Sequence, residues 1–413
     1  MKQLLLSCIF SWGLFFLPSS VENANAQKDH KFCISGEIDG LMPGDTLSFQ
    51  KIKFPYNGED GERAFNVIVN EPNKFSYSGK QPHTQYYRME YKPTSGKYQT
   101  KSTRALSIIM EEGDYQLKGT TDFIYNSTIS GGFYDTPLLK EILHMQDSLE
   151  IMRSKYIIII EEARANNNTE KSKEYIDKFN RFHDTHKEAY AALRKKKKEL
   201  TANNPSSTWV IVDYLKKVSY ASPEEIKSVL SNMNPKAQSS YYGQRLQQEI
   251  EIIEKLAPGN EAPFFSVTTI DGKRITSDDT KGKYLLLYHW GLCPGSISID
   301  KQVTALYEKY KEHLFVVGIT DDMQTIHKAN KEAKEDDEIL GMKLKPVLEN
   351  MVMHPWPEVE SSGDNHKIIK DFAFAGLPYF VFISPEGKII ERDFHKAYEK
   401  AKEVMKSEFD KMQ

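Results

Sequence analysis

The order of apolar and polar positions divides the chain into three parts. Between residues 31 and 130, short runs in which apolar and polar residues alternate are separated by turns rich in glycine and proline. Short strands at this spacing are typical of an antiparallel β-sandwich. The runs include residues 32–38, 46–49, 65–69, 75–79, 86–91 and 115–117. No cluster of catalytic or metal-binding residue types occurs in these runs, so the sequence assigns this part no chemistry.

The pattern changes to helical spacing after residue 136. Pro137 begins a run in which apolar residues recur every three or four positions. The predicted elements are a helical hairpin over residues 161–199 with a turn near 166–168, and helices at 207–218, 223–233 and 241–256. The four lysines at 195–198 fit a solvated helix face better than a binding patch. We interpret this part as a spacer or scaffold.

Residues 258–413 combine strands and helices. An apolar run at 284–288 predicts a buried strand, and Cys293 stands at the start of a helix that continues to about residue 310. The later elements are a strand at 314–319, a variable helical segment, a hairpin of strands at 379–383 and 388–391, and a helix at 396–412. The sequence therefore predicts a multi-domain chain, with a β-sandwich at 27–133, a helical spacer at 134–257 and an α/β domain at 258–413.

The first 26 residues have the layout of a secretory signal peptide. Lys2 supplies the positive start, residues 4–17 the apolar stretch, and Ala24-Asn25-Ala26 a cleavage site of small residues. The apolar stretch is too short for a membrane span, and no later segment is apolar enough to form one. We expect an exported protein of the periplasm or cell envelope.

Charge and cysteine content narrow the possible functions. The formal net charge of the 413 residues is −3, which gives no electrostatic sign of nucleic-acid binding. Beyond the signal peptide only Cys33 and Cys293 remain, too few for a disulfide framework. Cys33 lies in a strand-like run and is expected to be a buried, inert thiol, with pairing to Cys293 as the open alternative. The sequence predicts no cofactor and leaves the oligomeric state open.

Cys293 is the candidate reactive residue. The unpaired N–H groups and the positive dipole end of a helix N-terminus both favour the thiolate, which is the reactive form of cysteine. Pro294 suits the first helical position, where its missing N–H is not needed. Ser296 stands three residues after Cys293, where a dithiol site of the Cys-x-x-Cys type carries its second cysteine.

Three further segments resemble a known family. They are Asn-Glu-Ala-Pro-Phe-Phe at 260–265, the apolar strand ending in aspartate at 314–321, and Gly-Leu-Pro-Tyr at 376–379. Together with the cysteine motif, they resemble the TlpA/ResA-like and AhpC/TSA redoxins, which implies a thioredoxin fold for the C-terminal domain. The sandwich and the helical spacer resemble uncharacterised domains that precede TlpA-like modules in envelope proteins of Bacteroidota.

The resemblance implies roles for individual residues. Cys293 takes the position of the attacking thiol. Pro378 takes the position of a cis proline that faces this thiol, and Leu377 that of a residue whose backbone pairs with a disulfide-bearing strand. Trp290 and Pro294 are expected beside Leu377 at the substrate-docking surface.

Ser296 departs from the family pattern. In a dithiol enzyme the second cysteine resolves the mixed disulfide, and a serine hydroxyl cannot form that bond. Unless Cys33 lies nearby, the sequence predicts monothiol chemistry, by mixed-disulfide formation with protein thiols and disulfides or with a thiol reductant of the envelope. Ser296 would then donate a hydrogen bond to the thiolate. The alternative is a catalytically degenerate thioredoxin fold that serves as a binding or scaffold module.

Two other kinds of chemistry fit the sequence less well. A peroxiredoxin motif requires proline and threonine where this chain has Leu286 and Trp290. A metal site lacks a second cysteine or paired ligand spacing, so none is predicted from the histidines of this domain, which include His289, His354, His366 and His395. Residues 354–357 are expected to form a rigid loop beside the active site, and His395 to lie on the surface.

Overall fold

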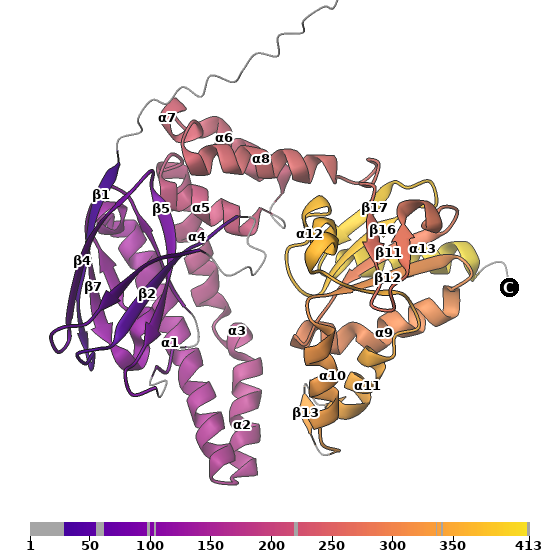
Figure 1. Ribbon diagram of the computed structural model, residues 1–413, viewed down its shortest axis with the longest axis horizontal. Coiled ribbons are helices and arrows are strands. Elements are labelled where there is room, and N and C mark those ends of the chain that lie inside the picture. Colours follow the sequence, from indigo (N-terminus) through magenta and orange to yellow (C-terminus); the bar gives the residue numbers. More distant parts are fainter. Residues whose placement is uncertain are drawn as a thin grey trace, which may run out of the picture.

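The computed structural model describes residues 29–54, 62–96, 100–102, 105–218, 222–335, 337–339 and 342–410. The expected signal peptide, residues 1–26, lies outside the described residues. Figure 1 shows the N-terminal sheets, the helices packed beside them, and a C-terminal α/β domain that the chain reaches through its eighth helix.

Two four-stranded sheets form the N-terminal part and enclose one hydrophobic core. Their orders are β4-β1-β7-β8 and β3-β2-β5-β6. The strands are β1 (His30–Asp39), β2 (Thr46–Lys51), β3 (Arg63–Ile68), β4 (Lys74–Gln81), β5 (Gln85–Lys92), β6 (Leu106–Met110), β7 (Gly113–Thr120) and β8 (Thr128–Ser130). Successive side chains of a strand point to opposite faces, which places Phe32 and Ile34 of β1 in the core between the sheets.

Two details of this part differ from the sequence-based expectation. β1 and β7 run parallel, because the chain between them passes through the other sheet and returns in the same direction. Cys33 is partly exposed rather than buried, since it alternates with Phe32 and Ile34, which point inward. Cys33 and Cys293 are both free thiols and do not pair.

Eight helices make up the described central part. They are α1 (Pro137–Ala165), α2 (Thr169–Asn180), α3 (Phe182–Thr185), α4 (Lys187–Asn203), α5 (Thr208–Lys217), α6 (Pro223–Asn232), α7 (Pro235–Gln238) and α8 (Tyr241–Lys255). The predicted hairpin turn is present, with Asn167 at φ 53° and the Asn168 side chain capping α2. Of the four lysines, Lys196 pairs with Glu141 of α1 at 2.8 Å, so this run also joins α4 to α1. No helix among the described residues is long and apolar enough to cross a membrane.

The C-terminal domain is built on a five-stranded sheet of order β15-β12-β11-β16-β17. Its elements are β9 (Ser266–Thr268), β10 (Arg274–Thr276), β11 (Tyr284–His289), α9 (Pro294–Tyr310), β12 (Leu314–Thr320), α10 (Met323–Glu332), β13 (Glu338–Ile339), β14 (Met342–Lys343), α11 (Leu344–Val352), β15 (Glu358–Glu360), α12 (His366–Asp371), β16 (Tyr379–Ile383), β17 (Ile389–Asp393) and α13 (Lys396–Phe409). β11, β12 and β15 are parallel, whereas β16 and β17 run antiparallel to their neighbours. This is a thioredoxin-like fold, as expected.

The central strand β11 separates two cores. All six of its residues are buried, which is typical of a strand covered on both faces. Leu286 and Tyr288 belong to the core under α9 and α13, while Leu285 and Leu287 belong to the core under α12. The carboxyl end of β11 and the start of α9 therefore meet at one edge of the sheet, and Cys293 lies between them.

Candidate active site

Cys293 occupies the N-cap of α9. Its sulfur accepts a hydrogen bond from the backbone N–H of Ser296 at 3.3 Å, and Pro294 follows as the first helical residue. The cysteine is partly exposed, and Pro294 is exposed beside it. The helix start that the sequence predicted is thus present. The sulfur accepts from a first-turn N–H that has no partner within the helix.

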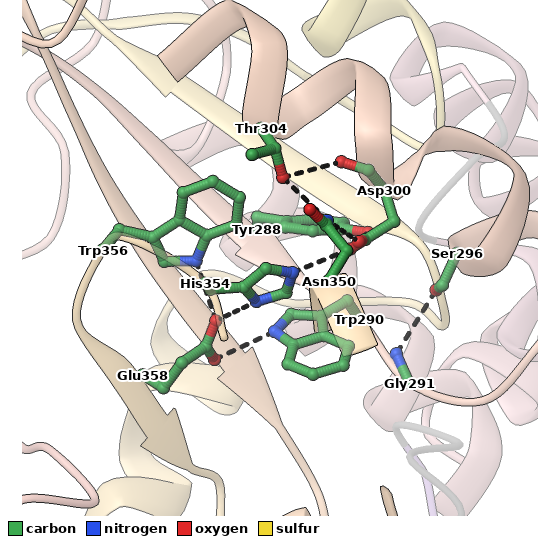
Figure 2. A network of polar contacts seen from close by, with 10 residues as sticks. All are labelled: Tyr288, Trp290, Gly291, Ser296, Asp300, Thr304, Asn350, His354, Trp356 and Glu358. Carbon is green, nitrogen blue, oxygen red and sulfur yellow. Dashed lines mark hydrogen bonds and ion pairs between the residues drawn. The ribbon is translucent and has the colours of Figure 1, made fainter. Parts of the chain in front are cut away.

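The hydroxyl of Ser296 is the second group on this sulfur. Its oxygen lies 3.2 Å from Cys293 Sγ, and Ser296 is fully buried. The N–H of Gly291 donates to the same oxygen at 3.3 Å, as Figure 2 shows. Either atom of this pair could be the donor, but when the sulfur is a thiolate only the serine hydroxyl has a proton to donate. The sulfur can therefore accept two hydrogen bonds from Ser296, one from N–H and one from O–H.

The loop that carries Leu377 and Pro378 lies against the first turn of α9. The Leu377–Pro378 peptide bond is cis, and the Cys293 thiol donates to the Leu377 carbonyl oxygen at 3.4 Å. A side chain at Gly295 would collide with the Pro378 ring, and one at Gly291 with the Leu377 side chain. These two glycines permit the loop to approach the thiol.

Trp290 does not lie where the sequence suggested. It was expected at the docking surface, but it is completely buried and packs beside Tyr288 in the core under α9. Its indole N–H donates to Glu358 of β15 at 3.0 Å. Trp290 therefore cannot contact a bound substrate in this structure and instead fixes the loop that leads to Cys293.

Glu358 is the centre of a buried polar network that includes Trp290 (Figure 2). Besides Trp290, its carboxylate accepts hydrogen bonds from His354 Nδ1 at 2.6 Å and from Trp356 Nε1 at 2.7 Å. A Cβ at the neighbouring Gly318 of β12 would overlap this carboxylate, so the glycine leaves room for it. Burial raises the pKa of Glu358, although the hydrogen bond from His354 acts in the opposite direction.

His354 joins this carboxylate to a second one on α9. Its Nε2 lies 2.9 Å from Asp300, which also accepts a hydrogen bond from Asn350 at 2.6 Å. The side chains of His354 and Asp300 are both completely buried. Burial by itself lowers the pKa of His354, but the hydrogen bonds and charges of Asp300 and Glu358 outweigh burial and raise the pKa to about 9. The imidazole is therefore a cation at neutral pH, held between two carboxylates.

The sequence-based prediction did not find this network. Residues 354–357 form a loop, as expected, but His354 points into the domain and does not line a surface. A signal was present, because Asp300 stands on the apolar face of α9 with Ile297 and Val303, where an aspartate needs a buried partner. His395 is exposed, as expected. Among the described residues, no group of three or more His, Cys, Asp or Glu is arranged to hold a metal ion.

Comparisons with known proteins concern the C-terminal domain. The model of the AhpC/TSA family matches residues 258–392. The thiol-disulfide oxidoreductase ResA of Bacillus cereus is 31% identical over 140 residues, which cover 34% of this chain and 70% of that protein. ResA of Bacillus thuringiensis (strain Al Hakam) is 28% identical over 141 residues, again covering 34% of this chain and 70% of the relative. Among solved structures, the thioredoxin domain of a thiol-disulfide oxidoreductase from Bacteroides vulgatus has 21% identity and a TM-score of 0.27, covering 36% of this chain and 98% of that one.

Proposed function

The chain belongs to the ResA-like thiol-disulfide oxidoreductases of the AhpC/TSA family, and we propose that it exchanges disulfides through a single thiol, Cys293. The observation that carries this proposal is the pair of hydrogen bonds that Ser296 can give to the Cys293 sulfur. Hydrogen bonds to an ionised group are about twice as strong as those between neutral groups, so both donors of Ser296 can stabilise negative charge on the sulfur when it attacks or leaves. A buried serine hydroxyl at this position can form a hydrogen bond with the sulfur but cannot form a disulfide bond with it.

Ionisation of Cys293 also changes the loop beside it. A thiol donates to the Leu377 carbonyl oxygen, whereas a thiolate has no proton to donate. When the proton leaves, this carbonyl becomes free to accept a hydrogen bond from the backbone of a substrate. The nucleophile and the docking group thus become available together.

The proposed reaction has two steps. The Cys293 thiolate attacks one sulfur of a substrate disulfide, a new S–S bond forms, and the other substrate sulfur leaves as a thiolate that takes up a proton. A second thiol, from a protein or from a small reductant, then attacks the substrate sulfur of the mixed disulfide and releases Cys293 as a thiolate. Each step breaks one disulfide bond and forms another, so neither step needs a further oxidant or reductant. Isomerisation results when the second thiol belongs to the same substrate.

The proposal also includes the cell compartment in which the protein acts. The apolar stretch at residues 4–17 and the small residues at 24–26 support export to the periplasm or envelope, where disulfides persist. The partners would be protein thiols and disulfides or a thiol reductant of that compartment.

Two assays test the proposal: isomerisation of a scrambled disulfide protein, and reduction of a mixed disulfide by a small thiol. We expect activity in the wild type and in Cys33→Ala, and none in Cys293→Ala. Mass spectrometry of the reaction should also trap one substrate chain on Cys293. If the wild type is inactive in both assays and forms no adduct, the proposal fails and a binding or scaffold role is favoured.

A further inference from the structure

Two side chains, His289 and Arg392, donate hydrogen bonds to the backbone of the loop between α12 and β16. A carbonyl oxygen can only accept, so His289 Nδ1 carries its proton and donates to the Gly376 carbonyl at 3.1 Å. Arg392 donates to the Ala373 carbonyl at 2.9 Å. The Leu377 carbonyl of the same loop contacts the Cys293 thiol. One backbone carbonyl of the loop therefore faces the thiol, while two others are fixed by His289 and Arg392.

The sheet brings these two residues to the same place. His289 ends β11 directly opposite Tyr379 of β16, and Arg392 of β17 is opposite Val381. All four side chains point to the face that α12 covers, because Tyr379 and Val381 belong to the core on that side. The guanidinium of Arg392 also lies over the Tyr379 ring, 5.6 Å from its centre. Both donors thus reach the loop from strands that flank β16.

Burial of His289 costs more desolvation free energy than burial of an apolar side chain would. It is only 6% exposed and packs against Phe374. Within the described part of the chain, its Nε2 makes no hydrogen bond and lies 3.5 Å from Asp321 Oδ1. A buried polar ring with one short hydrogen bond and one longer ionic contact costs more to desolvate than an apolar ring of the same shape. A histidine supplies two contacts here that an apolar ring lacks, the hydrogen bond to Gly376 and the ionic contact with Asp321, and the first of these acts directly on the loop.

We propose that His289 is a positioning residue that fixes the Leu377 backbone for pairing with an extended polypeptide disulfide. This inference rests on the proposed thiol exchange at Cys293 and adds a positioning residue to it. A polypeptide substrate needs both the thiol and a correctly placed loop. A small disulfide needs only the thiol, because it has no backbone to pair with Leu377. Loss of the His289 hydrogen bond should therefore slow reaction with peptides and spare reaction with small disulfides.

The test uses two probes with the same leaving group. One is 5,5′-dithiobis(2-nitrobenzoate), and the other is an extended peptide whose single cysteine is joined to 2-nitro-5-thiobenzoate. In both reactions Cys293 forms the new S–S bond and the coloured thiolate leaves with the electron pair. Single-turnover rates are measured in a Cys8→Ala, Cys33→Ala background, so that only Cys293 reacts.

His289→Phe keeps a ring of similar size without the donor, and His289→Asn keeps a donor close to the Nδ1 position. We expect His289→Phe to lower the peptide rate about tenfold, the value of one hydrogen bond, with the small-disulfide rate changed less than about twofold. His289→Asn should restore most of the peptide rate. If His289→Phe does not fold, Arg392→Leu and His289→Leu are compared by the same ratio of rates.

The outcomes separate the two proposals. Equal loss on both probes, or no loss on the peptide, overturns the positioning role while the thiol exchange stands. A wild-type Cys293 that reacts with neither probe overturns the proposed function and this inference with it.

Discussion

The hydroxyl oxygen of Ser296 lies 3.2 Å from the sulfur of Cys293, one helical turn into α9. A dithiol site has its second sulfur here. The serine is buried, and its hydroxyl oxygen also accepts a hydrogen bond from the Gly291 N–H.

Ser296→Cys should convert the site into a dithiol. The positions are three residues apart at a helix start, and the side-chain atoms already touch, which suits the geometry of a disulfide. We expect the mixed disulfide on Cys293 to stop accumulating and insulin reduction to proceed over many turnovers, measured as turbidity in the presence of a thiol reductant. The control is Ser298→Cys on the exposed face of the same helix, which should not change the wild-type behaviour. Persistent mixed disulfide in Ser296→Cys would contradict this prediction.

Ser296→Ala should weaken the nucleophile. It removes the O–H donor from the sulfur and leaves the Gly291 N–H without its acceptor. A hydrogen bond to a charged group contributes about 1.5–3 kcal/mol, so alkylation of Cys293 at neutral pH should slow at least about tenfold. The measurement is the rate of iodoacetamide labelling followed by mass spectrometry, with Ser298→Ala as the matched control. An unchanged rate would show that the hydroxyl does not support the thiolate.

His354 should make the stability of the C-terminal domain depend on pH. Its pKa is raised from 6.5 to about 9 in the fold, so its contribution is complete below about pH 6.5 and is lost as the pH rises through about 9. The full span corresponds to about 3 kcal/mol. We expect the urea midpoint, followed by tryptophan fluorescence, to fall over this interval.

His354→Gln should be less stable at pH 6.5, because it leaves two buried carboxylates without their cation, and it should lose the decline between pH 6.5 and 9. The control His395→Gln changes an exposed histidine of the same domain and should retain the decline. If His354→Gln declines as steeply as the wild type, another group is responsible.

Trp290→Phe and Trp356→Phe should separate stability from reactivity. Each removes one indole donor from the buried Glu358 carboxylate, so both should lower the free energy of unfolding by about 1–3 kcal/mol. Only Trp290 lies in the loop that leads to Cys293, so only Trp290→Phe should also change the alkylation rate of the thiol. Equal effects of the two variants on alkylation would mean that Glu358, rather than Trp290, controls the thiol.

The main features of the fold were readable from local pattern. Five consecutive apolar or aromatic positions, 284–288, predicted β11, and Cys293 followed by Pro294 predicted the start of α9. The pattern was weaker where pairing decides the outcome. The parallel pairing of β1 with β7 depends on the path of the chain through a second sheet. The alternation of residues within β1 does not predict which strand pairs with it or in which direction.

The site divides in the same way. Cys293, Ser296 and the loop with Pro378 stand in short motifs and could be named from the sequence. The partner of Trp290 could not, because Glu358 is 68 positions away and reaches it through β15. Likewise Asp300 and His354 meet across 54 positions.

By itself, the sequence determined the order of elements and the placement of one thiol at a helix start, because periodicity and helix-start residues act over a few neighbouring positions. Only the tertiary structure decided that Trp290 is buried and that His354 lies between two carboxylates. It also decided that His289 holds the loop opposite Cys293. Each of these depends on segments far apart in the chain that the sheet brings together, and the favourable energy of a buried charge or donor exists only once its partner is in place.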